Sequence, residues 1–556
     1  MAGHRAGRRR RCVGEPARAG RGVIRDFRAY DGAGEIACDL CIAGAGAAGI
    51  ALAAAFTDGA TRVVILESGG LELEDAVQDL YRGRNLGEPY FDLDTTRLRY
   101  LGGTTNHWGG MCAPLDEMDF RPRSWVPYSG WPIGRADLEP FYPKAHEILE
   151  IGPGGYDPTW VEPEEGLLPL APDRLVPRLF RFSSPPIWLG DKYRAALEAA
   201  TGVELWLHAS LVDIELGDDG RVAAFAVGNL AGRHARVHAR LFVLALGGIE
   251  NARLLLSSDR QIASGIGNRY DLVGRFFMDH LGASVGRVLI TRPGWEQAYA
   301  HRRHPKVDGH EIQHAVAPSE HLQRSAGILN NAAAFGRVVY ERPRSEGYGA
   351  LHDIKEGLRE RRMPHDFVAN LWRVLTDLDG IVRGLWERLD PTTYITMLSE
   401  QAPNPDSRVR LIDERDALGM RRMALDWRLA EIDHRTLRVV ATAIATELGR
   451  LGVGRVELGE WLRDDEVRWP DSLTGSHHHL GTTRMAEDPR HGVVDRDGRV
   501  FEHANLYVAG SSLFPTGGFA NPTVNLVALT LRLAEHLRAR LGEPLASASA
   551  PLATGR

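Results

Sequence analysis

Three glycines and one glutamate near the start of the chain have the spacing of a dinucleotide-binding site. Gly44, Gly46 and Gly49 form a GxGxxG motif between a short apolar run and an alanine-rich segment. In a strand–turn–helix unit, the first glycine permits the tight turn, the second lets the backbone approach a pyrophosphate, and the third lets helix and strand pack closely. The helix N-terminus then offers free N–H groups to the phosphates. A second apolar run, 62–66, ends at Glu67, whose carboxylate suits a ribose diol and repels a 2′-phosphate.

The segments around these residues predict an α/β fold, α+β overall, built on a parallel sheet. The motif alone does not separate FAD from NAD. The run 240–246, followed by Gly247 and a helical pattern, repeats the strand–glycine–helix order, so we expect another strand of the same sheet there. Other expected elements are a strand pair at 205–216 and 221–227, strands at 408–411, 422–427 and 505–509, and helices at 144–150, 434–451 and 523–541.

Length and composition place the chain among ordinary globular proteins. With 556 residues, two or more domains are expected. The net charge of -6 gives no case for nucleic-acid or membrane binding, and no apolar run is long enough to span a bilayer. Four cysteines are too few for a disulfide scaffold. Cys38 and Cys41 are spaced like a redox pair, but they fall in the first predicted strand, which favours a buried structural role.

Both ends of the chain have the composition of tails. The first 22 residues contain seven arginines and one acidic residue, without an apolar segment after them. This predicts a basic, disordered tail over 1–34 rather than an export signal, and hence a cytoplasmic protein. The Ala- and Ser-rich stretch 542–556 is expected to be a second tail.

Residues that could do acid–base chemistry stand near the C-terminal end. His477, His478 and His479 are adjacent, and Asn521 lies in an Asn-Pro-Thr sequence before an apolar helix. Adjacent histidines on an extended chain point to opposite faces and chelate one ion poorly, so we expect no metal. A neutral imidazole is a suitable general base near pH 7.

Taken together, the motifs resemble the glucose-methanol-choline (GMC) oxidoreductases. The segments are GAGAAG with Glu67, GGTTNHWGG, ALGGIENARLLL, VGRFFMDHL, EQAPNPDSRV, HHLGTTRM with GVVD, and NLYVAGSSLFPT with NPT. Each is weak evidence alone, but in this order they are specific, and they cover the chain from Ile36 to Leu541. The asparagine of NPT, where many members have histidine, is similar to the subgroup of pyranose 2-oxidase and bacterial FAD sugar dehydrogenases.

The resemblance implies an FAD-dependent enzyme that oxidises alcohols or sugars. It implies a Rossmann-like FAD-binding domain formed by 35–284 and 467–541, with a sheet-based substrate-binding domain at 285–466 inserted between the two parts. The residues then expected at the cofactor are Gly44, Gly46, Gly49, Glu67, Gly103, Thr104, Asn106, His107, Trp108, Val212, Gly247, Gly510, Ser511 and Thr523.

The family pattern also selects the catalytic residues. Its catalytic histidine stands three residues before the glycine of a Gly-Thr pair, which selects His478 before Gly481. His478 would take the hydroxyl proton while a hydride passes to the flavin, and Asn521 would hold the developing alkoxide with a donated hydrogen bond. The helix that starts near Thr523 would direct its positive end to the flavin C2=O region.

The expected substrate is carbohydrate-like: a sugar, a glycoside or an amino sugar, including a 6′-hydroxyl or ring hydroxyl of an aminoglycoside-type compound. Glu400 and Gln401 are the candidate substrate residues, since a polyhydroxy ligand needs several donors and acceptors. If Glu400 faces the pocket, its charge favours a cationic amino sugar. The alternative is that both residues satisfy backbone groups of a strand.

Several alternatives stay open at this stage. We expect non-covalent FAD, because Asn106 precedes His107 where pyranose 2-oxidase, which carries its flavin covalently, has threonine. The electron acceptor is oxygen, a quinone or a redox protein, and neither the exact hydroxyl nor the oligomeric state follows from the sequence. The competing functions are oxidation of a non-sugar alcohol, a hydroxynitrile-lyase type of activity with non-redox FAD, an inactive flavin-binding scaffold, and an NAD-dependent dehydrogenase.

Overall fold

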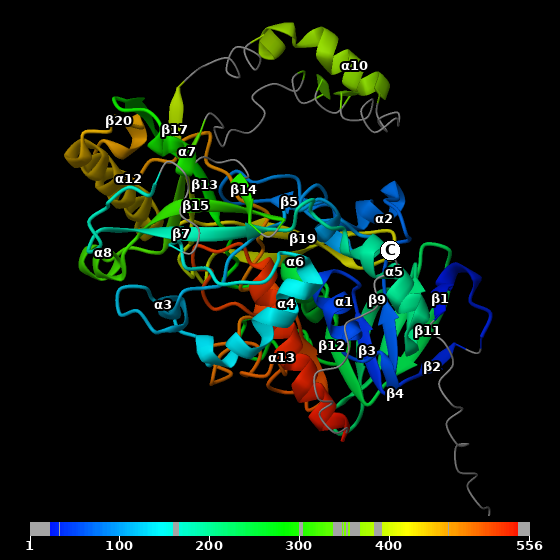
Figure 1. Cartoon of the computed structure of the whole chain (residues 1–556). Coiled ribbons are helices and arrows are strands. Elements are labelled where there is room, and N and C mark those ends of the chain that lie inside the picture. Colours follow the sequence, from blue (N-terminus) through cyan, green and yellow to red (C-terminus); the bar gives the residue numbers. More distant parts are fainter. Residues whose placement is uncertain are drawn as a thin grey trace, which may run out of the picture.

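Two large sheets organise the computed structural model of the chain. It describes residues 23–542, except 33, 160–165, 300–303, 308, 337–346, 348–349, 352–353, 356–366, 383–391 and 465. In Figure 1 the parallel sheet lies at the lower right, and the larger sheet lies at the upper left, with its long helix α12 beside it. The expected tail 542–556 lies outside the described residues apart from Gly542, as does 1–22 of the N-terminal tail.

The first large sheet is parallel and carries the glycine motif. Its strands, in spatial order, are β1 (Val23–Asp26), β8 (Thr201–Leu207), β4 (Asp58–Leu66), β3 (Leu40–Ala43), β12 (Leu241–Leu244) and β21 (Leu506–Val508). The strands β3 and β12 are apolar and buried along their whole length, as is typical of interior strands of a parallel sheet. The predicted strands at 38–43, 62–66, 240–246 and 505–509 are therefore confirmed, with shifted ends.

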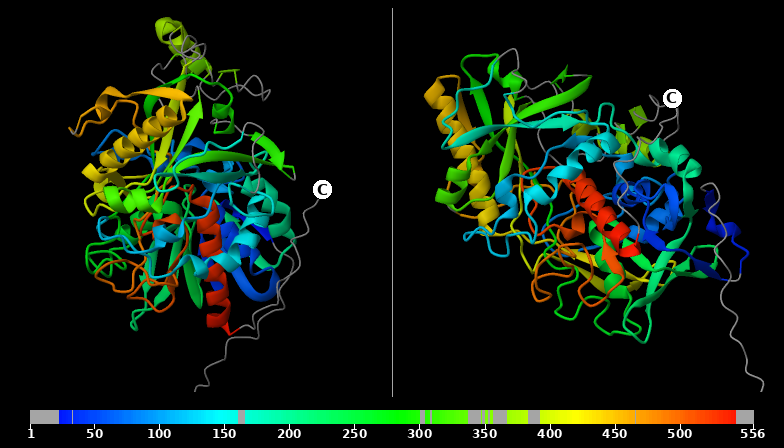
Figure 2. Two further views of the ribbon diagram at one scale, coloured as in Figure 1. Left: turned by 60° about the vertical axis from the view of Figure 1, so that its left-hand side comes forward. Right: turned by 60° about the horizontal axis from the view of Figure 1, so that its bottom comes forward.

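The helices of this part bring the two ends of the chain together. They are α1 (Ala47–Ala54), α4 (Tyr142–Leu149), α5 (Leu189–Ala199), α6 (Gly247–Ser257) and α13 (Thr523–Leu541). The C-terminal helix α13 packs against both α1 and α4, and the second view in Figure 2 shows it running beside the N-terminal strands. Its first residue is Thr523 and Pro522 is the N-cap, as the sequence predicts.

The second large sheet is antiparallel. Its strands, in order, are β20 (Gly454–Leu458), β13 (Leu281–Ile290), β17 (Thr393–Ser399), β16 (Asn331–Gly336), β15 (His310–Pro318), β7 (Leu175–Phe182) and β6 (Met111–Cys112), with β14 (His304–Val307) beside β15. Helix α12 (Glu431–Leu451) packs on it and buries its apolar stripe there. β6 and β7 precede residue 285, so this sheet draws on more of the chain than the expected 285–466 segment.

Smaller elements complete the fold. A four-stranded sheet contains β2 (Glu35–Ala37), β11 (His234–His238), β10 (Val222–Gly228) and β9 (Ser210–Leu216), and a three-stranded sheet contains β18 (Arg408–Arg415), β19 (Arg421–Asp426) and β5 (Gly83–Asn85). Short helices are α2 (Asp75–Gln78), α3 (Glu117–Phe120), α7 (Trp295–Ala298), α8 (Glu320–Ala326) and α10 (Phe367–Thr376). Among the residues described, no helix is long and apolar enough to cross a bilayer.

Two sequence expectations need correction here. The stretch 205–216 is not one strand: β8 ends at Leu207 and β9 begins at Ser210 in a different sheet. His208 lies between them with φ +53°, and its ring bonds to Glu74 and Asp26, which fixes the corner. The ordered chain also begins before residue 35, because Val23–Asp26 pairs in parallel with β8.

Candidate active site

The glycine motif forms the tight turn between β3 and α1. Gly44 has φ +101°, and a Cβ on it would lie 2.4 Å from the carbonyl oxygen of Ala245. A Cβ on Gly49 would lie 1.9 Å from the carbonyl oxygen of Gly44, so helix and strand meet only because this residue has no side chain. A Cβ on Gly46 would meet nothing within 4 Å. Gly46 therefore borders open space at the start of α1.

Glu67 lies at the end of the neighbouring strand and faces the same turn. It is buried, and its two carboxylate oxygens accept hydrogen bonds from the N–H groups of Ala45 (2.9 Å) and Gly69 (3.0 Å). Burial raises the pKa of Glu67, although these N–H groups oppose the rise. The carboxylate is thus held rigidly at the mouth of the glycine turn.

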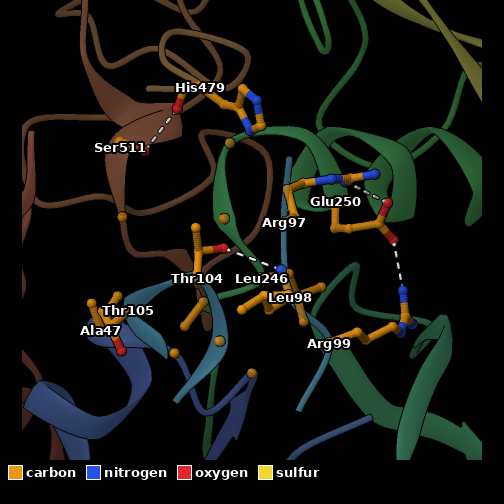
Figure 3. A pocket seen from close by; sticks show the side chains of 18 of the residues that line it. Ala47, Arg97, Leu98, Arg99, Thr104, Thr105, Leu246, Glu250, His479 and Ser511 are labelled. Carbon is orange, nitrogen blue, oxygen red and sulfur yellow. Dashed lines mark hydrogen bonds and ion pairs between the residues drawn. The ribbon is translucent and has the colours of Figure 1, made fainter. Parts of the chain in front are cut away.

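A cavity of about 320 Å³ runs from this turn toward the C-terminal histidines. It lies at the carboxyl ends of β3, β4 and β12, where open α/β sheets bind their ligands. The predicted cofactor residues that line it are Gly44, Gly46, Glu67, Gly103, Thr104, His107, Trp108, Gly247, Gly510, Ser511 and Thr523. Figure 3 shows Ala47, Thr104 and Thr105 on one side of it, and Ser511 and His479 at its far end.

Three predicted cofactor residues do not line this cavity. Gly49 acts through packing, as described above. Asn106 is buried and donates from Nδ2 to the carbonyl of Leu101 (2.8 Å). Val212 lies on β9, and its neighbour Leu211 lines the cavity instead.

A charged cluster borders the cavity between Glu67 and the histidines. Arg97 and Arg99 pair with Glu250 at 3.0 and 3.3 Å, and all three side chains line the cavity (Figure 3). Burial raises the pKa of Glu250, but Arg253, Arg97 and Arg99 outweigh it and lower that pKa to about 2. Sequence reasoning missed this cluster, because its members are far apart in the chain.

His478 and Asn521 meet at the other end of the cavity. The Nδ2 atom of Asn521 lies 3.3 Å from Nε2 of His478, in a geometry that lets the amide donate to the ring. A second cavity, of about 260 Å³, shares Gly109, Met111, Ser476, His478 and Asn521 with the first. The predicted catalytic pair therefore stands where the two cavities join.

One carboxylate holds the backbone of two of the three histidines. Asp279 accepts from the N–H groups of His478 (2.8 Å) and His477 (3.1 Å), and from the hydroxyl of Tyr90 (2.5 Å). His479 is buried and its Nε2 lies 3.1 Å from that hydroxyl. His477 and His479 are thus neighbours with separate environments.

Within the described part of the chain, no group of three or more His, Cys, Asp or Glu side chains is placed to hold a metal ion.

His478 is neutral near pH 7. Burial, helped by the nearby rings of His280, His477 and His479, lowers the pKa of His478 well below the usual value. A neutral imidazole retains one nitrogen lone pair, which is what a general base requires. His107, which lines the first cavity, also has a lowered pKa, from burial and from His477.

Glu400 and Gln401 do not face either cavity, which corrects the expectation that they contact substrate. Glu400 is fully buried in an ion pair with Arg123. Gln401 accepts from the N–H of Asp279 (2.9 Å) and from the indole of Trp427 (3.0 Å). Both side chains accept hydrogen bonds from buried donors behind the site. The geometry therefore favours a structural role for Glu400 and Gln401.

The second cavity, which we call the substrate-side cavity, contains two polar residues that the sequence did not single out, Gln313 and Ser476. Gln313, Ser476 and Asn521 line it, and each has a buried polar atom (Nε2, Oγ and Oδ1) without a hydrogen-bond partner among the described residues. Gln313 lies in the middle of β15, where the alternation of a strand places it on the cavity face. No motif marks it, so only the fold could reveal it.

The comparisons with known proteins agree with this geometry. The sequence profile of the family described as GMC oxidoreductase matches residues 403–530. The chain is 25% identical to 6'''-hydroxyparomomycin C oxidase of Streptomyces lividus over 90% of this chain and 92% of that protein. It is 24% identical to the fructose dehydrogenase large subunit of Gluconobacter japonicus over 79% of this chain and 80% of that one.

A solved structure shares the fold. Pyridoxine 4-oxidase from Mesorbium loti superposes with a TM-score of 0.53 over 90% of this chain and 99% of that one, at 17% identity. At this identity the similarity concerns the fold alone.

Proposed function

We propose that the chain is a member of the GMC oxidoreductases, to which it is similar, and that it oxidises a hydroxyl-bearing carbon of a sugar or glycoside to the carbonyl with bound FAD. The observation that carries the proposal is the His478–Asn521 pair at 3.3 Å, placed where the dinucleotide cavity joins a second cavity. A dinucleotide oxidant and a substrate alcohol would meet at this pair.

The residues of the first cavity fit FAD. The glycine turn leaves room that a Cβ on Gly46 would enter, and Glu67 offers a fixed carboxylate to a ribose diol. The helices α1 and α13 both begin at the cavity, so their N-termini favour negative charge there. Bound FAD supplies the hydride acceptor of the reaction.

The chain itself supplies the proton acceptor and the orientation of the alcohol. An alcohol bound at the pair would donate its O–H to Nε2 of His478 and accept a hydrogen bond from Nδ2 of Asn521. As the C–H hydride leaves for the oxidant, the O–H proton passes to His478 and the carbon–oxygen bond becomes a carbonyl. Asn521 has no acidic proton near pH 7, so it stabilises the developing alkoxide without competing for the proton.

The substrate-side cavity supports a neutral polyhydroxy ring. One part of its wall carries the partnerless atoms of Gln313, Ser476 and Asn521, and the rest is apolar, with Phe180 and Leu398. A sugar ring presents hydroxyls at its edge and C–H groups on its faces, which suits both kinds of wall. None of the described residues that line this cavity is a carboxylate.

An amino sugar is the second candidate. It is favoured by the 6'''-hydroxyparomomycin C oxidase of Streptomyces lividus, a relative over most of the chain. The argument through the charge of Glu400 no longer supports it, because Arg123 neutralises that carboxylate.

Flavin bleaching tests the proposal. The purified protein is mixed without oxygen with D-glucose, D-fructose, a methyl glycoside, an amino sugar and benzyl alcohol. Loss of the oxidised flavin absorbance with a sugar is the expected result. Absence of bleaching with every compound, together with turnover of a cyanohydrin, would instead indicate the hydroxynitrile-lyase type. Re-oxidation of the bleached enzyme with oxygen, a quinone or a cytochrome then identifies the acceptor.

Two finer proposals accompany this one. FAD is bound without a covalent link to His107, and acid precipitation tests this by leaving the yellow colour in the supernatant. The protein is cytoplasmic, which fractionation of the cells that produce it tests.

A further inference from the structure

His280 contacts the catalytic histidine from behind. Its Nδ1 lies 3.0 Å from Nδ1 of His478, and its Nε2 lies 2.9 Å from the carbonyl oxygen of Gly518. The two rings are nearly perpendicular, with centroids 5.0 Å apart. His280 precedes β13, is 1% exposed and lines neither the cofactor cavity nor the substrate-side cavity. It therefore touches neither substrate nor cofactor.

These contacts determine the protons on both rings. A carbonyl oxygen only accepts, so Nε2 of His280 carries a proton and donates to Gly518. In a neutral ring, Nδ1 of His280 then has the lone pair and accepts a hydrogen bond. The proton between the rings must therefore be on Nδ1 of His478. That leaves the lone pair of His478 on Nε2, the nitrogen next to Asn521 at the junction of the cavities.

We propose that His280 is a positioning residue that holds His478 in the tautomer with Nε2 free to take the substrate proton. The proposal rests on the proposed function for the identity of the reaction, but the tautomer is a property of the enzyme alone. Without an acceptor at Nδ1, only the 3.3 Å contact from Nδ2 of Asn521 favours this tautomer. His478 can then also put its proton on Nε2, and in that form it has no lone pair facing the alcohol.

Buried residues also surround the side of His280 that faces away from His478. The carbonyl of Gly518 accepts from His280, and the backbone of the same residue helps to lower the pKa of the Glu400 carboxylate. Glu400 is in turn paired with Arg123. Glu400, which the sequence analysis assigns to substrate binding, thus lies among the residues behind His478.

His280 acts on protonated His478 in two opposite ways. Once His478 has taken the proton, its Nδ1–H becomes a charge-assisted donor to neutral His280, which favours the charged form. The nearby ring of His280 also contributes to the lowered pKa of His478. The other titratable groups around the pair are His477 and His479 beside His478, and Asp279 and Glu400 near His280. The proposal is therefore tested through the tautomer and the rate, and not through a shift of the pKa.

Two substitutions separate the roles of the His280 nitrogens. In His280→Asn, the side-chain oxygen occupies the position of Nδ1 and still accepts from His478. In His280→Gln, the side-chain nitrogen occupies the position of Nε2 and still donates to Gly518, but nothing accepts from His478. Both variants are polar and similar in size, so a merely structural role would make their effects alike.

The first measurement does not depend on the substrate. In holoenzyme with ¹⁵N-labelled histidine, the signals of His478 are identified by their loss in His478→Gln. We expect protonated Nδ1 and unprotonated Nε2 in the wild type and in His280→Asn, and a mixture in His280→Gln. A proton on Nε2 of His478 in the wild type would overturn the proposal, whatever the substrate proves to be.

The second measurement is anaerobic flavin reduction by the compound of the sugar panel that bleaches the wild type fastest. In His280→Gln the limiting rate should fall about tenfold to a hundredfold, within the range that a general base supplies, with the substrate concentration at half-maximal rate nearly unchanged. His280→Asn should retain most of the rate. Equal losses in both variants would contradict the proposal, whereas a wild type that no sugar reduces would contradict the proposed function alone.

Discussion

Arg123 and Glu400 form an ion pair with two hydrogen bonds, 2.8 and 2.5 Å, and neither side chain reaches solvent. The pair lies under the active site, and Glu400 also accepts from the N–H of Asn330 (3.0 Å). Burial alone raises the pKa of Glu400, but Arg123 outweighs it and holds that pKa below its usual value. The carboxylate is therefore a structural charge, and we do not expect it to select a cationic substrate.

Glu400→Gln should destabilise the protein without changing its substrate preference. Removal of one partner of a buried pair leaves an uncompensated charge on Arg123, at a cost of about 3–5 kcal/mol in the free energy of unfolding. Because the pKa of Glu400 is lowered on folding, the contribution of the pair is present above the unfolded value of about 4.3 and is lost as pH falls through the folded pKa. Chemical unfolding at pH 7 measures the loss.

Glu117→Gln is the matched control. Glu117 pairs with Arg121 on the surface, with both side chains more than half exposed, so its loss should be hardly measurable. A shift of the ratio of kcat/KM between amino sugar and neutral sugar in Glu400→Gln would contradict the structural role.

The glycine turn and the closeness of His478 to Asn521 were predictable from the sequence, because they depend on local geometry or on motifs. Gly44, Gly49 and Glu67 lie as the spacing indicates, since a strand, a turn and a helix determine their positions within a few residues. His478 and Asn521 were selected by the family pattern and lie together, although 43 positions separate them.

The residues that hold His478 in place and those that line the substrate-side cavity were not predictable in this way. VGRFFMDHL was identified as a motif, but only the fold shows that its Asp279 and His280 hold the backbone and the ring of His478. Gln313 lies on a strand whose polar and apolar residues give no signal of a cavity. Glu400 was misplaced because the charge of a residue does not reveal whether a partner such as Arg123 neutralises it.

Substitution of the three histidines should separate catalysis from stability. His478→Ala should slow flavin reduction by about a hundredfold to ten-thousandfold, since the general base is lost, while FAD content stays the same. His477→Ala should be mild, because Nε2 of His477 has no partner among the described residues. His479→Ala should lower the melting temperature, since this buried ring bonds to Tyr90. Single-turnover rates and thermal unfolding of all three variants check this order, and a rate loss greatest in His479→Ala would contradict the assignment of the base.

The pH dependence of flavin reduction should follow the lowered pKa of His478. The base acts when it is unprotonated, so the rate should fall only as pH drops below the folded pKa of His478. Burial and the neighbouring rings place that pKa well below the ordinary value of about 6.5. We therefore expect a rate that is constant from pH 8 to about pH 6 and falls at lower pH. Stopped-flow reduction across this range measures the limb, and a midpoint above the ordinary histidine value would contradict a buried, neutral base.

The glycines offer a test of the cofactor site that does not depend on turnover. In Gly46→Ala the new methyl group enters open space, so the protein should fold but bind less FAD. In Gly49→Ala the methyl group meets the Gly44 carbonyl, so α1 must move from β3 at a cost of about 1–3 kcal/mol or more. FAD per protein and the melting temperature of the FAD-free form distinguish the two. A fully loaded Gly46→Ala enzyme would show that the pyrophosphate does not approach this residue.

Gln313→Leu should weaken sugar oxidation selectively. Nε2 of Gln313 is a buried donor without a partner in the part of the chain that the structure describes, and it lines the substrate-side cavity. A substrate hydroxyl that accepts from it would gain about 0.5–1.5 kcal/mol, so its loss should lower kcat/KM for the preferred sugar about two- to tenfold. Benzyl alcohol, which has no second hydroxyl, should be oxidised equally by both enzymes. Because leucine is nearly isosteric and leaves no unpaired donor, the melting temperature should not fall.

Gln401→Leu is the control. Gln401 bonds to Asp279, Trp427 and Arg428 behind the site, so this variant should lose stability instead of selectivity. If Gln313→Leu lowers kcat/KM for benzyl alcohol as much as for the sugar, the residue shapes the cavity and does not bind a hydroxyl.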